Sequence, residues 1–252
     1  MWLRTAMNYQ YRYGGDLNSS LKTLWSEGGI SRLYQGLPFA LVQGPLTRFG
    51  DTAANVGILA LLESFPETAS LPMPLKTVCG SVAAGSWRIL CMPIDTSKTA
   101  MQVQGSEGFN KLKEKVLSEG PSPLYQGAIA SAVATAVGHF PWYLTYNYLN
   151  EAIPEVSKET LLLFLGRSAL IGLTSSCVSD CCSNSIRVIK TTKQTASLDE
   201  GKSDMSYKEI LDLIIEQDGL IGLFGRGLQT RLLTNALQGA VFSVLWKYFQ
   251  TA

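Results

Sequence analysis

One sequence pattern occurs three times along this chain, at intervals of more than ninety residues. The copies read MWLRTAMNYQ, MPIDTSKTAMQ and NSIRVIKTTKQ. Each copy places a basic residue four positions before an amide residue: Arg4 and Asn8, Lys98 and Gln102, Lys190 and Gln194. The basic residues are therefore 94 and 92 residues apart. A chain built on such a period is expected to fold as a set of similar units.

A second element follows each copy and strengthens this interpretation. It reads EGGISRLYQG, EGPSPLYQG and DGLIGLFGRG, and it ends at Gly36, Gly127 and Gly227. Two elements that recur three times in the same order indicate a tandem triplication. We therefore expect one domain over 1–252, composed of repeats at 1–64, 73–152 and 159–252.

The composition favours a membrane protein whose helices line a polar space. Hydrophobic residues make up 46% of the chain and charged residues only 16%. The formal charge of +1 argues against a nucleic-acid partner, which requires a basic surface. No run of about 18–20 apolar residues is present, yet several long apolar segments carry scattered polar residues. Such residues are tolerated inside a membrane where they line water or pair with each other.

Each repeat is predicted to hold two spanning helices joined by a short amphipathic one. The amphipathic pieces are Leu17–Glu27, Asn110–Glu119 and Ser206–Gln217. In the last piece, Ile210, Leu211, Ile214 and Ile215 form one apolar stripe, which we expect to lie on the membrane surface. The first repeat is incomplete. Either the sequence begins inside the protein or the protein has lost most of its first helix, so we expect this helix to be truncated.

These motifs resemble those of the mitochondrial carrier family. That family repeats Pro-x-[Asp/Glu]-x-x-[Lys/Arg], found complete here at Pro93, Asp95 and Lys98, followed by an element ending in a glycine. The resemblance implies six spanning helices around a central pathway in the mitochondrial inner membrane. It also implies that the protein moves small solutes along this pathway by alternating access. It also implies that cardiolipin phosphates bind at Gly36, Gly127 and Gly227.

The first motif has a direct physical consequence. A proline inside a helix removes one backbone hydrogen bond and bends the helix. An acid and a base three residues apart share one helix face, so bent helices can close a ring of ion pairs. We expect a bend at Pro93. The third copy has Ser185 in place of the proline.

The ring implied by the resemblance is incomplete in this chain. Asp95 facing Lys190 is the one intact pair, and Met1 takes the acid place opposite Lys98. Arg187 is expected to face Arg4, a contact between like charges. The full set of expected gate residues is Arg4, Asp95, Lys98, Gln102, Arg187, Lys190 and Gln194. A second gate motif of the family lacks its carboxylate at Asn55-Val56, Tyr146-Asn147 and Trp246-Lys247.

Solute-contacting positions also follow from the resemblance, by counting from the repeat glycines. They are Gln43, Gly44, Thr47, Arg48, Asp51, Ala134, Thr135, Gly138, His139, Trp142, Thr234, Asn235 and Gln238. Arg48 and Asp51 are the certain charges in this mostly neutral set. Together they suit a small polar or zwitterionic solute, such as an amino acid, or they pair with each other.

The sequence thus predicts an all-α membrane protein with short surface helices and no enzymatic activity. A lone histidine, His139, cannot form a metal cluster, and we expect neither a metal nor a cofactor. Two functions remain open. One is a solute transporter, favoured by the retained motif residues. The other is a carrier-derived structural subunit of a larger inner-membrane complex, favoured by the missing gate carboxylates.

Overall fold

The computed structural model describes residues 1–156, 160–199 and 205–251. Within these ranges, it describes the backbone but not the side chains of residues 55, 73, 74, 162, 239, 240 and 242–251. This part of the chain is helical and contains no strand, which confirms the predicted all-α class. The helices are α1 (Trp2–Tyr13), α2 (Leu17–Leu33), α3 (Leu37–Ser64), α4 (Pro66–Ala69), α5 (Met73–Leu90), α6 (Met92–Glu119), the 3-10 turn η1 (Ser122–Tyr125), α7 (Ala128–Ala152), α8 (Leu161–Ala196), α9 (Tyr207–Gly225) and α10 (Leu228–Thr251).

A proline marks the break between two of the long helices. The helix breaks at Cys91 between α5 and α6, with Pro93 in the first turn of α6, and the two parts meet at 66°. Because proline has no N–H group, it fits the first turn of a helix without loss of an intrahelical hydrogen bond. Two other prolines, Pro45 of α3 and Pro141 of α7, lie inside helices that continue past them. The third repeat has Ser185 at the corresponding place, and α8 continues without interruption from Leu161 to Ala196. The bend predicted at Pro93 is therefore present.

The peripheral helices use their apolar faces differently from the prediction. Ile210 and Ile214 of α9 are fully buried, and they pack with Met7 and Tyr11 of α1 and Val188 of α8. The stripe expected on the membrane surface thus belongs to a hydrophobic core. Packing against α1 and α8 removes its apolar side chains from water, which stabilises the fold. A capping box between Ser206 and Glu209 begins the helix.

Basic side chains tie each peripheral segment to the end of another helix. Arg32 of α2 donates to the carbonyl oxygens of Gln102 and Val103 in α6, at 2.9 and 2.8 Å. Lys115 of α6 donates to the carbonyl of Ser197 after α8, and Arg226 donates to that of Arg12 in α1. Carbonyl groups near a helix C-terminus lack intrahelical partners, so they can accept these bonds. The three helices that supply the carbonyls, α1, α6 and α8, contact one another, and we call this region the hub.

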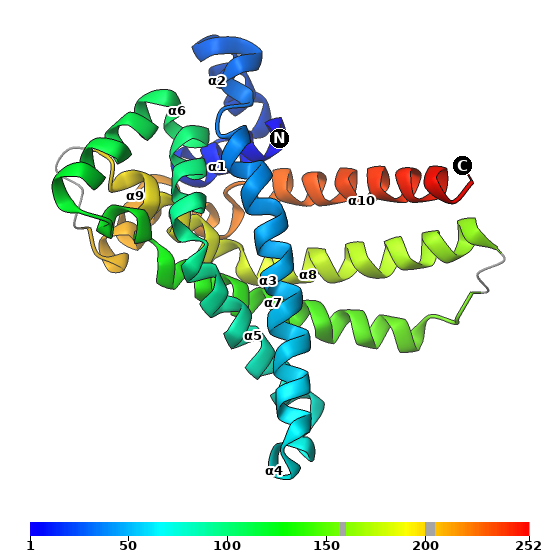
Figure 1. The fold of residues 1–252 in the computed structure, drawn as a ribbon. Coiled ribbons are helices and arrows are strands. Elements are labelled where there is room, and N and C mark those ends of the chain that lie inside the picture. Colours follow the sequence, from blue (N-terminus) through cyan, green and yellow to red (C-terminus); the bar gives the residue numbers. More distant parts are fainter. Residues whose placement is uncertain (157–159, 200–204, 252) are drawn as a thin grey trace.

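The long helices diverge from this hub. α3 packs on α5, α5 on α7, α7 on α8, and α8 on α10, while α1 contacts α6, α8 and α10. In Figure 1, α3 and α5 run toward α4, whereas α7, α8 and α10 extend in another direction. Among the described residues, no individual helix has the length and apolarity of a membrane span. The bent pair Leu75–Leu90 and Met92–Glu119 meets that criterion jointly.

Candidate functional site

A single carboxylate organises the hub end of the molecule. Asp95, which is 6% exposed, accepts from Lys98 of its own helix at 2.9 Å and forms an ion pair with Lys190 of α8. Gln194 donates to the same carboxylate at 3.4 Å. The structure therefore brings together the one ion pair that the motifs left intact. We call Asp95, Lys98, Lys190 and Gln194, together with Gln43, the Asp95 cluster.

Gln43 belongs to this cluster and not to the solute-contacting positions where the sequence placed it. Its amide nitrogen donates to Asp95, and its carbonyl oxygen accepts from Lys98 at 2.5 Å. The glutamine therefore bridges the carboxylate and the lysine that the motifs left without an acid. Counting from Gly36 put Gln43 in the cavity, but it lies in the part of α3 that packs on α6. The amide of Gln102, another expected gate residue, accepts from Asn8 at 2.6 Å.

The two remaining gate candidates, Arg4 and Arg187, each bond to another residue. Arg4 donates to Gln238 of α10 at 3.0 Å. Arg187 donates to Ser183 one turn earlier in α8, at 3.2 Å, and lines the central cavity. Arg4 therefore has a neutral partner in α10, and Arg187 has one in its own helix. The expected contact between the two arginines stays a prediction.

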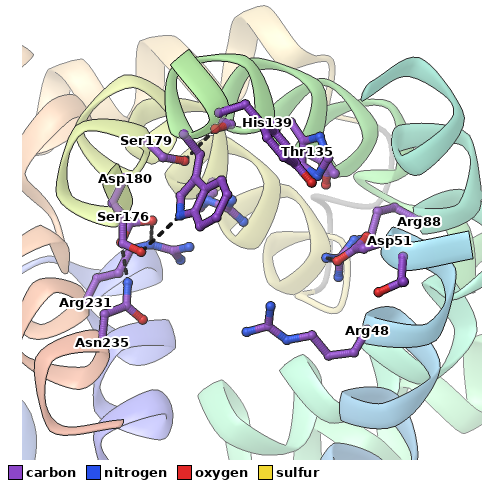
Figure 2. Close-up of a pocket in the computed structure, with 15 residues that line it drawn as sticks. Arg48, Asp51, Arg88, Thr135, His139, Ser176, Ser179, Asp180, Arg231 and Asn235 are labelled. Atoms are coloured by element: carbon purple, nitrogen blue, oxygen red, sulfur yellow. Dashed lines mark hydrogen bonds and ion pairs between the residues drawn. The ribbon is translucent and has the colours of Figure 1, made fainter. Parts of the chain in front are cut away.

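A cavity of about 380 Å³ lies between the diverging helices. Its lining comes from α3, α5, α7, α8 and α10 (Figure 2). Seven predicted solute-contacting residues line it: Arg48, Asp51, Thr135, Gly138, His139, Trp142 and Asn235. The other predicted residues lie outside the lining: Gln43, Gly44, Thr47, Ala134, Thr234 and Gln238. Thr47 and Thr234 instead bond to carbonyl groups of their own helices.

Two ion pairs stand on opposite sides of this cavity (Figure 2). Arg88 of α5 lies 2.8 Å from Asp51 of α3, so Asp51 does not pair with its helical neighbour Arg48. On the other side, Arg231 of α10 pairs with Asp180 of α8, which also accepts from Asn235. Each pair joins two helices of the bundle.

Two further arginines in the lining have no carboxylate partner among the described residues. They are Arg48 of α3 and Arg187 of α8. Figure 2 shows the guanidinium group of Arg48 extending between the two ion pairs. With four arginines and two aspartates, the described lining carries a net charge of +2.

Sequence counting missed a large part of this lining. It passed over Thr52, Arg88, Tyr143, Ser176, Ser179, Asp180 and Arg231, and it assigned Arg187 to the gate. The signal that could have found the charged ones is their isolation within apolar helices, since an ionisable residue in such a segment marks a polar interior. Asp180, within the long α8, is the clearest example.

The three repeat glycines precede long helices and approach the hub closely. Gly36, Gly127 and Gly227 have φ values of +80°, +79° and +65°, a region that disfavours other residues. A Cβ atom at Gly36 would lie 3.0 Å from the carbonyl oxygen of Lys98. At Gly227 it would lie 2.7 Å from the ring of Tyr11. These glycines thus serve a tight turn and close helix packing.

The positions of the second gate motif are only partly described. The side chains of Asn55, Trp246 and Lys247 lie outside the described residues. Tyr146 stacks on Trp142, with ring centroids 5.0 Å apart.

Helices that surround a charged cavity, and that meet at an ion cluster at one end, have the organisation of a solute carrier. The family model described as "Mitochondrial carrier protein" matches residues 69–157 and 163–252. This chain belongs to the mitochondrial carrier family.

Several curated proteins of the family are similar to the chain. The "Mitochondrial substrate carrier family protein X" of Dictyostelium discoideum is 25% identical over 88% of this chain and 72% of its own length. The human "Mitochondrial basic amino acids transporter" is 24% identical over 94% of this chain and 78% of its own. The human "Mitochondrial thiamine pyrophosphate carrier" is 25% identical over 68% of this chain and 58% of its own, so the chain spans less than two thirds of it.

Proposed function

We propose that this protein is a multi-pass transporter of the mitochondrial inner membrane that carries a small anionic solute through the central cavity. The observation that carries the proposal is the pair of arginines, Arg48 and Arg187, without a carboxylate partner among the described residues. Two unit charges 4 Å apart attract each other by about 4 kcal/mol at an effective dielectric constant of 20. An anion bound between these arginines would gain this attraction.

The charge of the lining separates the possible cargoes. A cationic solute, of the kind for which the basic amino acids transporter is named, would enter a space with a net charge of +2 and be repelled. A zwitterion held by Arg48 and Asp51 would have to displace Arg88 from Asp51. An anion meets neither obstacle. The thiamine pyrophosphate carrier is a relative named for an anionic cargo.

The Asp95 cluster supplies the gate that alternating access requires. It joins α3, α6 and α8 through one buried carboxylate. Opening this end of the cavity must separate Lys190 from Asp95, and breaking a buried ion pair is costly. We propose that solute binding above the cluster offsets this cost during each transport cycle.

Two further parts of the family pattern belong to the same proposal. The chain forms one carrier domain of three repeats, 1–64, 73–152 and 159–252. In addition, cardiolipin binds where the repeat glycines begin α3, α7 and α10, because the first N–H groups of a helix attract a phosphate. Support for this lipid site is the position of Gly36 and Gly127 as the residues that precede the first turns.

A transport-inactive subunit of a larger complex is the less favoured alternative. The relatives described above are all named as carriers or transporters, and the charged cavity would have no use in such a subunit. Purification in mild detergent distinguishes the two: a transporter elutes without stoichiometric partner subunits, whereas a structural subunit stays with them.

Uptake into proteoliposomes tests the proposal directly. The full chain is reconstituted and supplied in turn with labelled inorganic phosphate, ribose 5-phosphate, a dicarboxylate, a neutral amino acid and lysine. Uptake of at least one anion, abolished by Arg187→Gln, is the expected result. Uptake of the amino acids alone would contradict the anionic assignment. Absence of any uptake, with partner subunits retained in detergent, would favour the structural role.

A further inference from the structure

Aromatic side chains of α7 form one wall of the central cavity. His139, Trp142 and Tyr143 all line it, and they come from little more than one turn of the same helix. The Tyr143 ring lies 5.0 Å from both the His139 ring and the Trp142 ring, in edge-to-face arrangements. The wall is thus a continuous set of three rings.

Contacts with neighbouring side chains hold the Trp142 indole in place. Its Nε1–H donates to the hydroxyl oxygen of Ser176 in α8 at 3.3 Å. Its ring is stacked on Tyr146, which lies outside the cavity lining, with an interplanar angle of 10°. His139 is held in a similar way, since its Nδ1 is 3.3 Å from the hydroxyl of Ser81 in α5. A ring fixed before binding loses little conformational freedom when a ligand packs on it.

The same cavity holds Arg48 and Arg187, the arginines for which the described part of the chain offers no carboxylate partner. We infer that the solute carries both an anionic group and a planar aromatic ring, with the anion held by these arginines and the ring packed on the Trp142 wall. Aromatic rings gain from offset stacking and edge-to-face contact beyond the area they bury. A cavity of about 380 Å³ falls within the usual range for small-molecule sites. This inference rests on the proposed transport of an anion.

Matched pairs of solutes, with and without a ring, separate ring recognition from anion recognition. AMP is compared with ribose 5-phosphate, and phenyl phosphate with inorganic phosphate, as competitors and as labelled substrates of the reconstituted full chain. We expect the ring-bearing member of at least one pair to be recognised about twofold to twelvefold more tightly, since an aromatic contact contributes about 0.5–1.5 kcal/mol.

Two variants test whether Trp142 supplies this difference. Trp142→Ala is expected to remove the preference for the ring, so that half-saturation by the two members of a pair becomes similar within the variant. Trp142→Phe should restore most of the preference. Tyr148→Ala, on an exposed side chain of the same helix outside the lining, is the control and should change neither value. Retained uptake of the ringless anion shows that Trp142→Ala still folds.

The outcomes distinguish this inference from the proposed function. Equal recognition of both members in both pairs, or an equal loss for both in Trp142→Ala, overturns the aromatic assignment. Provided that uptake of the ringless anion still depends on Arg187, the anion transporter would stand. If no anion of either kind is taken up or competes, both proposals fail together.

Discussion

The carboxylate of Asp95 in α6 forms an ion pair with Lys190 in α8, 95 residues further along the chain. It also accepts from Lys98, three residues later in its own helix. One buried carboxylate thus holds two ammonium groups, and the structure describes no second acid in this cluster. Where each lysine could have had its own acid, the chain uses Asp95 twice.

Removal of this carboxylate should therefore affect both lysines. Asp95→Asn is expected to lower the free energy of unfolding in detergent by about 3–5 kcal/mol, because it leaves buried charges without compensation. Uptake of the anion should fall by at least about tenfold, as the gate no longer closes. Asp212→Asn, at an exposed position of α9, is the control for loss of one acid. Unchanged uptake by Asp95→Asn would show that the cluster is not a gate.

The Gln43 bridge gives a second, smaller effect at the same place. Gln43→Ala removes one hydrogen bond to Asp95 and one from Lys98. Asp95 and Lys98 still pair with each other when Gln43 is removed. The stability should therefore fall by about the value of one hydrogen bond to a charged group, about 1.5–3 kcal/mol. Measured half-saturation by the solute should change less than the maximal rate, because Gln43 lies outside the cavity lining. A change confined to half-saturation would show that Gln43 contacts the solute and does not act in the gate.

One glycine before a long helix and one inside a long helix should respond to alanine in opposite ways. Gly227→Ala places a Cβ atom 2.7 Å from the Tyr11 ring at a φ of +65°, so it should destabilise the protein by more than about 1 kcal/mol. Gly44→Ala meets nothing within 4 Å inside α3 and should stabilise it by up to about 1 kcal/mol. Thermal unfolding in detergent measures both. Equal shifts would mean that the close approach at Gly227 is absent.

The contact between Arg32 and the α6 backbone just before Gly105, where that helix is interrupted, should be a major source of stability. Arg32→Met keeps the apolar stem but leaves the carbonyls of Gln102 and Val103 without this donor. The expected loss is about 2–4 kcal/mol, since buried acceptors then lack a partner. Arg32→Lys should recover only part of it, because an ammonium group cannot match the geometry of a guanidinium. Full recovery of the stability by Arg32→Lys would show that the contact depends on the positive charge alone.

Local backbone chemistry made some of the fold predictable. Pro93 predicted the break before α6, and α8, which has Ser185 at the corresponding place, is continuous. The burial of Ile210 and Ile214 was not predictable in the same way. An apolar stripe looks the same in sequence whether it faces lipid or a neighbouring helix, and only the packing of α1 and α8 decides this.

The candidate site divides along a similar line. Counting from the repeat glycines found Arg48, Asp51 and Trp142, because a regular helix keeps its faces in register. Counting along one helix cannot predict which residues pair between helices. It therefore suggested Arg48 as a partner for Asp51, whereas the structure pairs Asp51 with Arg88. Asp180 and Arg231 were missed because no spacing within one helix reveals a contact across two.

Charge dependence of uptake tests the central claim most directly. Proteoliposomes holding the full chain, or its Arg48→Gln, Arg187→Gln or doubly substituted forms, are compared in the uptake of labelled phosphate compounds and labelled lysine. Uptake of the anion should fall by about tenfold or more for each single substitution and further for the double one, while lysine stays excluded from the unsubstituted protein. Anion uptake that is indifferent to both substitutions, or efficient lysine uptake by the unsubstituted protein, would contradict a cationic cavity built to carry an anion.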